Sequence, residues 1–132
     1  RGKQDALLEV TVNEEAPLFA DEFRLRIILS HLITNAIKFK RPDQDKARVK
    51  LTYNCNKDLA EIRVTDSGIG ILQTHLNQIF RMFFKTQDRE SGPGIGLYIV
   101  KEALQKMGGE IVVQSEPNEG TEFTIQIPNN PT

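Results

Sequence analysis

The sequence has few of the features that would indicate a membrane, a disulfide framework or a polyanionic partner. Cys55 is its single cysteine, which excludes an internal disulfide and a cysteine-based metal site and favours a reducing compartment. No apolar run approaches the roughly 20 residues that a membrane span requires, and no signal peptide is visible. The formal net charge of −1 gives no reason to expect a nucleic-acid partner. We therefore expect a cytoplasmic domain that contacts neither membrane nor nucleic acid, whether or not its parent protein is membrane-anchored.

Two common phosphate-binding motifs are also absent. No Gly-Lys-Ser or Gly-Lys-Thr occurs, which excludes a Walker P-loop. The stretch SGPGIGLYIV (91–100) has the spacing GxGxG after polar residues, whereas a Rossmann fingerprint needs GxGxxG directly after a strand. Two interpretations of this stretch remain. It is a flexible hinge before a helix, or a loop whose glycines let the backbone approach a ligand and whose helix N-terminus favours an anion.

The 132 residues suit a single domain with its own core. The chain does not begin with Met, so we expect residues 1–132 to be a domain excised from a longer protein. Periodicity predicts strands at 7–12, 47–53, 59–64, 110–114 and 121–127, helices at about 22–39 and 95–107, and a short helix or two within 72–84. Hairpins interspersed with helices predict a two-layer α/β sandwich, in which about three helices cover one face of a mixed, mostly antiparallel sheet.

Two further stretches bear on ligand binding. In DSGIG (66–70), Asp66 is either a plain turn-former or a carboxylate that accepts a hydrogen bond from an amine such as that of adenine. His31, Asn35 and Lys38 lie on one stripe of the first predicted helix, beside its apolar arc. This stripe is either a solvated helix edge or part of a magnesium–phosphate site, with Asn as a neutral oxygen ligand and Lys as a point charge. A glycine loop suited to phosphates and a turn suited to a base edge together favour a nucleotide site.

Taken in order, five stretches resemble the motif boxes of the catalytic, ATP-binding domain of two-component sensor histidine kinases. HLITNAIKF (31–39) resembles the N box, and DSGIGI (66–71) resembles the first glycine box. IFRMFFK (79–85) resembles the F box, GPGIGLYIVK (92–101) the second glycine box, and MGGEIVVQSEPNEGTEF (107–123) the closing hairpin. The resemblance covers nearly the whole chain. It implies the Bergerat ATP-binding fold, which gyrase, the related heat-shock chaperone and mismatch-repair ATPases share.

The resemblance implies a role for each matching residue in binding ATP and Mg²⁺. Asn35 would ligate Mg²⁺, Lys38 would contact phosphate, and His31 stands beside them as a third catalytic candidate. Asp66 would bind the adenine amine. The other implied cofactor-binding positions are Gly68 and Gly70 in the adenine turn, Thr121 near the adenine–water network, Lys85 in the ATP lid together with Phe80 and Phe83, and Gly92, Gly94, Gly96 and Leu97 where the lid ends over the phosphates.

One position departs from the family pattern. Four residues before the Asn of the N box, these kinases often have a second Asn and the gyrase branch has a catalytic Glu, whereas this chain has His31. A neutral His still donates or accepts one hydrogen bond near the phosphates. It lacks the carboxylate that activates water, which favours phosphoryl transfer over hydrolysis. It also puts Mg²⁺ binding and full catalysis in question.

The implied function is that of a protein-histidine kinase. The domain would bind Mg-ATP and supply the γ-phosphoryl group to a histidine on a separate dimerisation domain, with a response regulator downstream. His31 lies in the ATP-site helix and His75 in another predicted helix, so we expect the acceptor histidine N-terminal to this chain. The polar stretch 85–91 is compatible with a lid that moves. A regulatory module (a pseudokinase or an anti-sigma-type serine kinase), a hydrolytic gyrase-type ATPase and a domain without a ligand stay open as alternatives.

Overall fold

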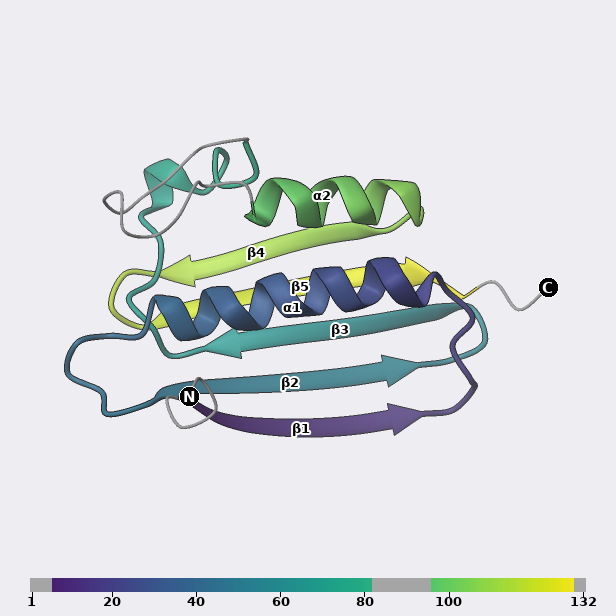
Figure 1. Cartoon of the computed structure of the whole chain (residues 1–132), viewed down its shortest axis with the longest axis horizontal. Coiled ribbons are helices and arrows are strands. Elements are labelled where there is room, and N and C mark those ends of the chain that lie inside the picture. The colour runs from purple at the N-terminus through teal and green to yellow at the C-terminus, as the bar shows by residue number, and fades with distance from the viewer. Residues whose placement is uncertain (1–5, 82–95, 130–132) are drawn as a thin grey trace.

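The computed structural model describes residues 6–81 and 96–129. In this part the chain forms five strands, two α-helices and one 3-10 helix, drawn in Figure 1. The elements in chain order are β1 (Ala6–Glu14), α1 (Glu22–Lys38), β2 (Ala47–Cys55), β3 (Leu59–Asp66), η2 (Gln73–His75), α2 (Gly96–Lys106), β4 (Glu110–Glu116) and β5 (Gly120–Pro128).

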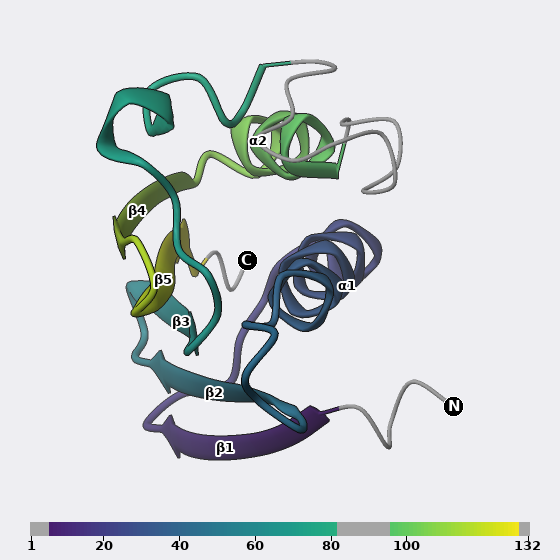
Figure 2. The ribbon, with the colours of Figure 1, turned by 90° about the vertical axis from the view of Figure 1, so that its left-hand side faces the viewer.

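The five strands form one sheet in the order β1-β2-β3-β5-β4. β1 pairs with β2 in parallel because α1 connects them as a crossover, and the other three pairings are antiparallel. Figure 2 shows both helices on the same face of the sheet. The expected two-layer α/β sandwich with a mixed, mostly antiparallel sheet is confirmed.

In the described residues the number of helices is slightly lower than the three or so that we expected. Between 72 and 81, where the sequence predicted a short helix or two, the chain forms only the single turn η2. The residue before this turn, Leu72, provides no side-chain cap. The side chain of Gln73 is held elsewhere, because its Nε2 donates a 2.6 Å hydrogen bond to the carbonyl oxygen of Ser115. An uncapped turn of this kind is too short to nucleate a longer helix.

The two α-helices begin and end where their local sequence predicts. Asp21 caps α1 by accepting a 3.1 Å hydrogen bond from the backbone N–H of Arg24. α2 is followed by Gly108 in the left-handed conformation (φ +74°), and the N–H of Gly109 donates to the carbonyl oxygen of Leu104. This is the usual glycine stop of a helix. In the part of the chain that the structure describes, no helix has the length and apolarity to cross a membrane.

The core lies between the helices and the covered face of the sheet. Its largest fully buried side chains are Ile28, Leu32, Leu104, Ile125, Ile127, Val64 and Val100. Along β3 and β5 every second residue points into this core. Asp66 and Thr121 occupy inward positions at the ends of these two strands. The alternation of the sheet therefore places a carboxylate and a hydroxyl at the edge of the apolar core.

Candidate functional site

The C-terminal half of α1 contacts both glycine motifs. The N–H of Ile69, in the DSGIG turn, donates a 3.0 Å hydrogen bond to the carbonyl oxygen of Phe39 at the end of α1. Two turns earlier, His31 faces the first residue of α2, because a Cβ added at Gly96 would lie 3.3 Å from the His31 Nδ1. Figure 2 views this end of the molecule and shows α1 and α2 side by side over one face of the sheet.

Of the polar stripe that the sequence predicted, His31 makes the second contact, and Asn35 and Lys38 lie between the two contacts. Asn35 is half-buried, and Lys38, the residue directly before Phe39, is exposed. The structure thus brings the stripe, the DSGIG turn and the N-terminus of α2 to one end of the sandwich. Of the residues expected in the lid, Lys85, Gly92 and Gly94, together with Phe83, lie outside the described residues.

Asp66 lies at this end of the molecule, where it forms, with Thr121 and Ser115, a polar surface that we call the floor of the site. Its Oδ1 accepts hydrogen bonds from the backbone N–H groups of Gly68 (2.8 Å) and Thr121 (3.3 Å). Burial raises the pKa of the Asp66 carboxyl, and the two N–H donors oppose that rise by stabilising the charged form. A carboxylate held this way can accept a further hydrogen bond from a ligand amine.

Three strands contribute one residue each to this floor. Asp66 of β3 pairs in register with Thr121 of β5, and Thr121 pairs with Ser115 of β4. Ser115 and Thr121 are both buried, and their hydroxyl oxygens are 2.8 Å apart. Ser115 is a site residue that the sequence analysis missed, because the predicted strand ended at 114. The available signal was a serine that continues the inward alternation of Ile111 and Val113.

The DSGIG turn is clamped between α1 and the β4–β5 hairpin. On the hairpin side, the N–H of Asn118 donates a 2.6 Å hydrogen bond to the carbonyl oxygen of Ile69. Gly70 has φ +77°, and a Cβ there would collide with the carbonyl oxygen of Glu116. On the other side, a Cβ at Gly68 would collide with the carbonyl oxygen of Phe39. Both positions therefore need glycine for packing, independently of any ligand.

Two other expected site residues pack against the protein interior. The ring of Phe80 meets that of Phe123 edge-to-face, with centroids 6.3 Å apart, and Lys101 Nζ lies 5.4 Å from the Phe80 centroid. Phe80 thereby ties the segment after η2 to α2 and β5. Leu97 is half-buried and packs on the core. The ligand contacts proposed for these residues remain predictions.

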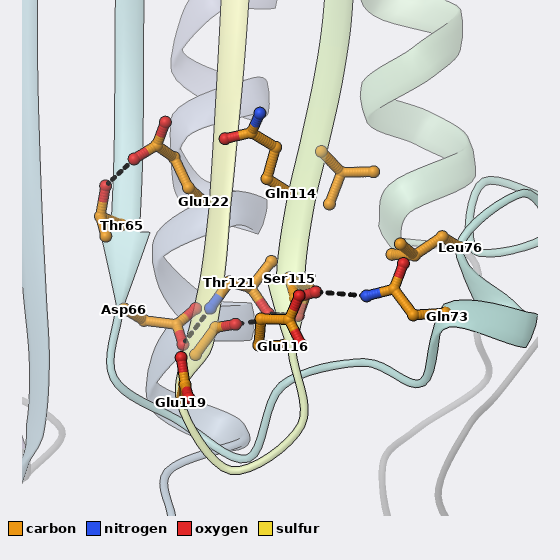
Figure 3. A pocket seen from close by; sticks show the side chains of 12 residues that line it. Thr65, Asp66, Gln73, Leu76, Gln114, Ser115, Glu116, Glu119, Thr121 and Glu122 are labelled. Atoms are coloured by element: carbon orange, nitrogen blue, oxygen red, sulfur yellow. Dashed lines mark hydrogen bonds between the residues drawn. The ribbon is translucent and has the colours of Figure 1, made fainter.

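A cavity of about 550 Å³ lies against the ends of β3, β4 and β5 (Figure 3). Asp66, Ser115 and Thr121 contribute to its wall, together with the carboxylates of Glu116, Glu119 and Glu122. Four carboxylates in the wall repel a triphosphate, so this cavity is unfavourable for phosphates.

The donor set at this end of the molecule suits Mg²⁺ only in company with a ligand. The described residues contain no group of three His, Cys, Asp or Glu side chains that could hold a metal. Mg²⁺ usually keeps several waters and takes few protein ligands beside substrate phosphates. A single amide oxygen, that of Asn35, fits this mode of binding only together with phosphate oxygens from a ligand.

The fold is a two-layer α/β sandwich with a partly buried carboxylate, Asp66, at the end of β3 and a glycine-started helix, α2, packed against His31 of α1. A family model described as histidine kinase-, DNA gyrase B- and HSP90-like ATPase matches residues 20–131. The chain therefore belongs to this ATPase family.

The relatives in this family are sensor kinases. The chain is 38% identical over 125 residues to the aerobic respiration control sensor protein ArcB of Escherichia coli, covering 91% of this chain and 16% of ArcB. It is 37% identical to the sensor histidine kinase RcsC of Salmonella typhimurium, covering 84% of this chain and 12% of that protein. The chain thus spans about an eighth to a sixth of the length of these relatives.

Solved structures agree with these matches. The mycobacterial sensor histidine kinase MprB superposes with a TM-score of 0.78 at 30% identity, covering 98% of this chain and 85% of that chain. Full-length ShkA in complex with AMPPNP gives a TM-score of 0.76 at 31% identity, covering 95% of this chain and 26% of that one. The resemblance inferred from the motif boxes is confirmed: this is an ATP-binding catalytic domain of the histidine-kinase type.

Proposed function

We propose that this domain binds Mg-ATP and supplies the γ-phosphoryl group for autophosphorylation of a histidine on a separate dimerisation domain. The parent protein would act in the cytoplasm and pass the phosphoryl group to a response regulator. The observation that carries the proposal is the contact of α1 with both glycine motifs. Through this contact Asp66, the proposed base-binding carboxylate, lies at the same end of the molecule as the start of α2, the proposed phosphate-binding group. ShkA, which is 31% identical, was solved with a non-hydrolysable ATP analogue.

In this proposal the residues of the site have separate tasks. Asp66 accepts a hydrogen bond from the adenine amine, and the clamped Gly68 and Gly70 hold its turn in place. Asn35 offers the metal-binding oxygen and Lys38 a charge to phosphate. Mg²⁺, when bound, would neutralise charge on the phosphates. Gly96 starts α2, whose free N–H groups face the phosphates. Thr121 lies beside the base. The remaining contacts, on the side of the lid, come from Lys85, Gly92, Gly94 and Leu97.

Phosphoryl transfer depends mainly on positioning and charge neutralisation, so the domain needs no nucleophile of its own. His31 faces Gly96 and brings no carboxylate to activate water, which favours transfer over hydrolysis. The acceptor histidine belongs to another domain in this proposal, so the domain alone binds nucleotide without transferring phosphate. A regulatory nucleotide-binding module is the second candidate, since His31 occupies a position where these kinases often have Asn.

Calorimetric titration with a non-hydrolysable ATP analogue, with and without Mg²⁺, tests this proposal. We expect binding that strengthens with Mg²⁺ and that weakens at least about tenfold in Asp66→Asn, because that change removes a hydrogen bond to a charged group. Asp58 is an exposed aspartate directly before the first residue of β3. Asp58→Asn is therefore the matched control and should bind like the wild type. Binding that ignores Mg²⁺ would favour the regulatory module, and a folded domain that does not bind would refute both.

A further inference from the structure

The proposed function gives no task to the site residue Ser115, yet all the hydrogen-bonding capacity of its hydroxyl group is used. The N–H of Ile71 donates to its Oγ at 2.8 Å. The Oγ lies 2.9 Å from the carbonyl oxygen of Gly120 and 2.8 Å from the hydroxyl oxygen of Thr121. A serine hydroxyl has one hydrogen and two lone pairs. These three neighbours therefore account for all of its hydrogen-bonding capacity.

The three contacts can be satisfied together in only one way. A carbonyl oxygen cannot donate, so the single hydrogen of Ser115 goes to the Gly120 carbonyl. The N–H of Ile71 takes one lone pair of Ser115, and the remaining lone pair must accept the hydroxyl hydrogen of Thr121. Since that hydrogen is committed to Ser115, Thr121 has only lone pairs to offer on its other sides.

The neighbouring Asp66 is an acceptor as well. Its Oδ1 is occupied by the N–H groups of Gly68 and Thr121, and an ionised carboxylate has no hydrogen to give. Asp66 and Thr121 are register partners on adjacent strands. Side by side, they form a floor that can accept hydrogen bonds and cannot donate them.

We propose that Ser115 is a positioning residue that fixes the direction of the Thr121 hydroxyl, keeps the floor of the base site acceptor-only, and so sets a preference for a 6-amino over a 6-oxo purine. This inference rests on the proposed nucleotide-binding function. A 6-amino group brings N–H donors to the floor, whereas a 6-oxo group brings only lone pairs and meets those of Asp66 and Thr121. In Ser115→Ala the Thr121 hydroxyl is released, so it can turn and donate to a 6-oxo group.

The test compares ADP with IDP, which has a 6-oxo purine, by calorimetry on folded variants. We expect the wild type to prefer ADP, and Ser115→Ala to reduce the ratio of the two dissociation constants by about tenfold, the worth of one hydrogen bond gained or lost. Thr121→Ser keeps the hydroxyl and should retain the wild-type ratio. In a Thr121→Val background, Ser115→Ala should leave the ratio unchanged, because no hydroxyl remains to be turned.

The outcomes separate this inference from the proposed function. If Ser115→Ala weakens ADP and IDP by the same factor, Ser115 has only a structural role and the inference is wrong. If Ser115→Ala does not fold, Thr121→Val and Thr121→Ser still decide: equal ADP/IDP ratios in the two would overturn the inference. A wild type that binds neither nucleotide would refute the proposed function instead.

Discussion

Asp66 shows how a single residue of the site works against the stability of the fold. Its carboxyl lies at the edge of the core, and burial raises its pKa above the ordinary value, although the N–H groups of Gly68 and Thr121 partly oppose this. An acid whose pKa is higher in the folded state stabilises the fold at low pH, and that stabilisation is lost as the pH rises through the folded-state pKa. At neutral pH the ionised carboxylate is therefore a cost to the ligand-free protein.

We accordingly predict that Asp66→Asn increases the free energy of unfolding of the ligand-free domain at pH 7, although the same change weakens nucleotide binding. The amide oxygen still accepts from Gly68 and Thr121, but no charge is buried. The gain should shrink as the pH falls toward the unfolded-state pKa of about 3.9. Urea unfolding at pH 7 and at pH 4 measures this. A variant less stable than the wild type at pH 7 would contradict it, and Asp58→Asn should show no comparable gain.

At the scale of elements, the DSGIG turn owes its position to close backbone contacts on both sides. α1 meets it through the Phe39 carbonyl, and the β4–β5 hairpin meets it through the Glu116 carbonyl. The hairpin itself touches β3 closely, because Gly120 has φ +130° and a Cβ there would collide with the carbonyl oxygen of Asp66. Glycines in the motif boxes thus let three elements converge on Asp66.

Two glycines with nearly the same backbone conformation allow the cost of a close contact to be distinguished from the cost of the left-handed conformation. Gly70 (φ +77°) abuts the Glu116 carbonyl, whereas a Cβ at Gly108 (φ +74°) would meet only the Pro128 Cγ, at 3.6 Å. We predict that Gly108→Ala destabilises the fold by about 1 kcal/mol, the cost of the left-handed conformation. Gly70→Ala should cost about 3 kcal/mol or more, because the backbone must also shift. Chemical denaturation measures both, and equal costs would show that the close contact is unimportant.

At the scale of the whole molecule, the site lies at one end of the sandwich, where the C-terminal half of α1 meets the start of α2 (Figure 2). The domain spans a small part of the sensor kinases to which it is similar. A site at the end of a domain suits a reaction whose acceptor is on another domain. The greater length of these relatives and the position of the site at one end of the domain both support the proposed transfer between domains.

We predict that the domain alone forms no phosphohistidine, and that adding a separately produced dimerisation domain with an acceptor histidine restores transfer from labelled ATP. Asn35→Ala should lower that transfer about a hundredfold or more, since it removes a group that helps to stabilise the phosphates. Asn54→Ala, an exposed position on β2, is the control. Labelling of His31 or His75 in the isolated domain would contradict the proposal.

Much of this protein follows from its sequence by itself. Helix and strand periodicity are local, so α1, α2 and the strands were predicted within a few residues of their observed bounds. The motif boxes occur in the order of the histidine-kinase domain, and the family match agrees with them. The residue types at Asn35, Lys38 and Asp66 were sufficient to propose a nucleotide site.

Only the tertiary structure decided which residues meet. The pairing of β3 with β5 sets Thr121, together with its hairpin partner Ser115, beside Asp66. That register depends on contacts between residues about 50 positions apart, which local patterns do not encode. Likewise, His31 lies next to Gly96 only because α1 and α2 pack together. The direction of the Thr121 hydroxyl depends on Ser115, whose hydroxyl is also hydrogen-bonded to Ile71 and Gly120. Sequence therefore determined the chemistry available at the site, and long-range packing determined how its hydrogen bonds are arranged.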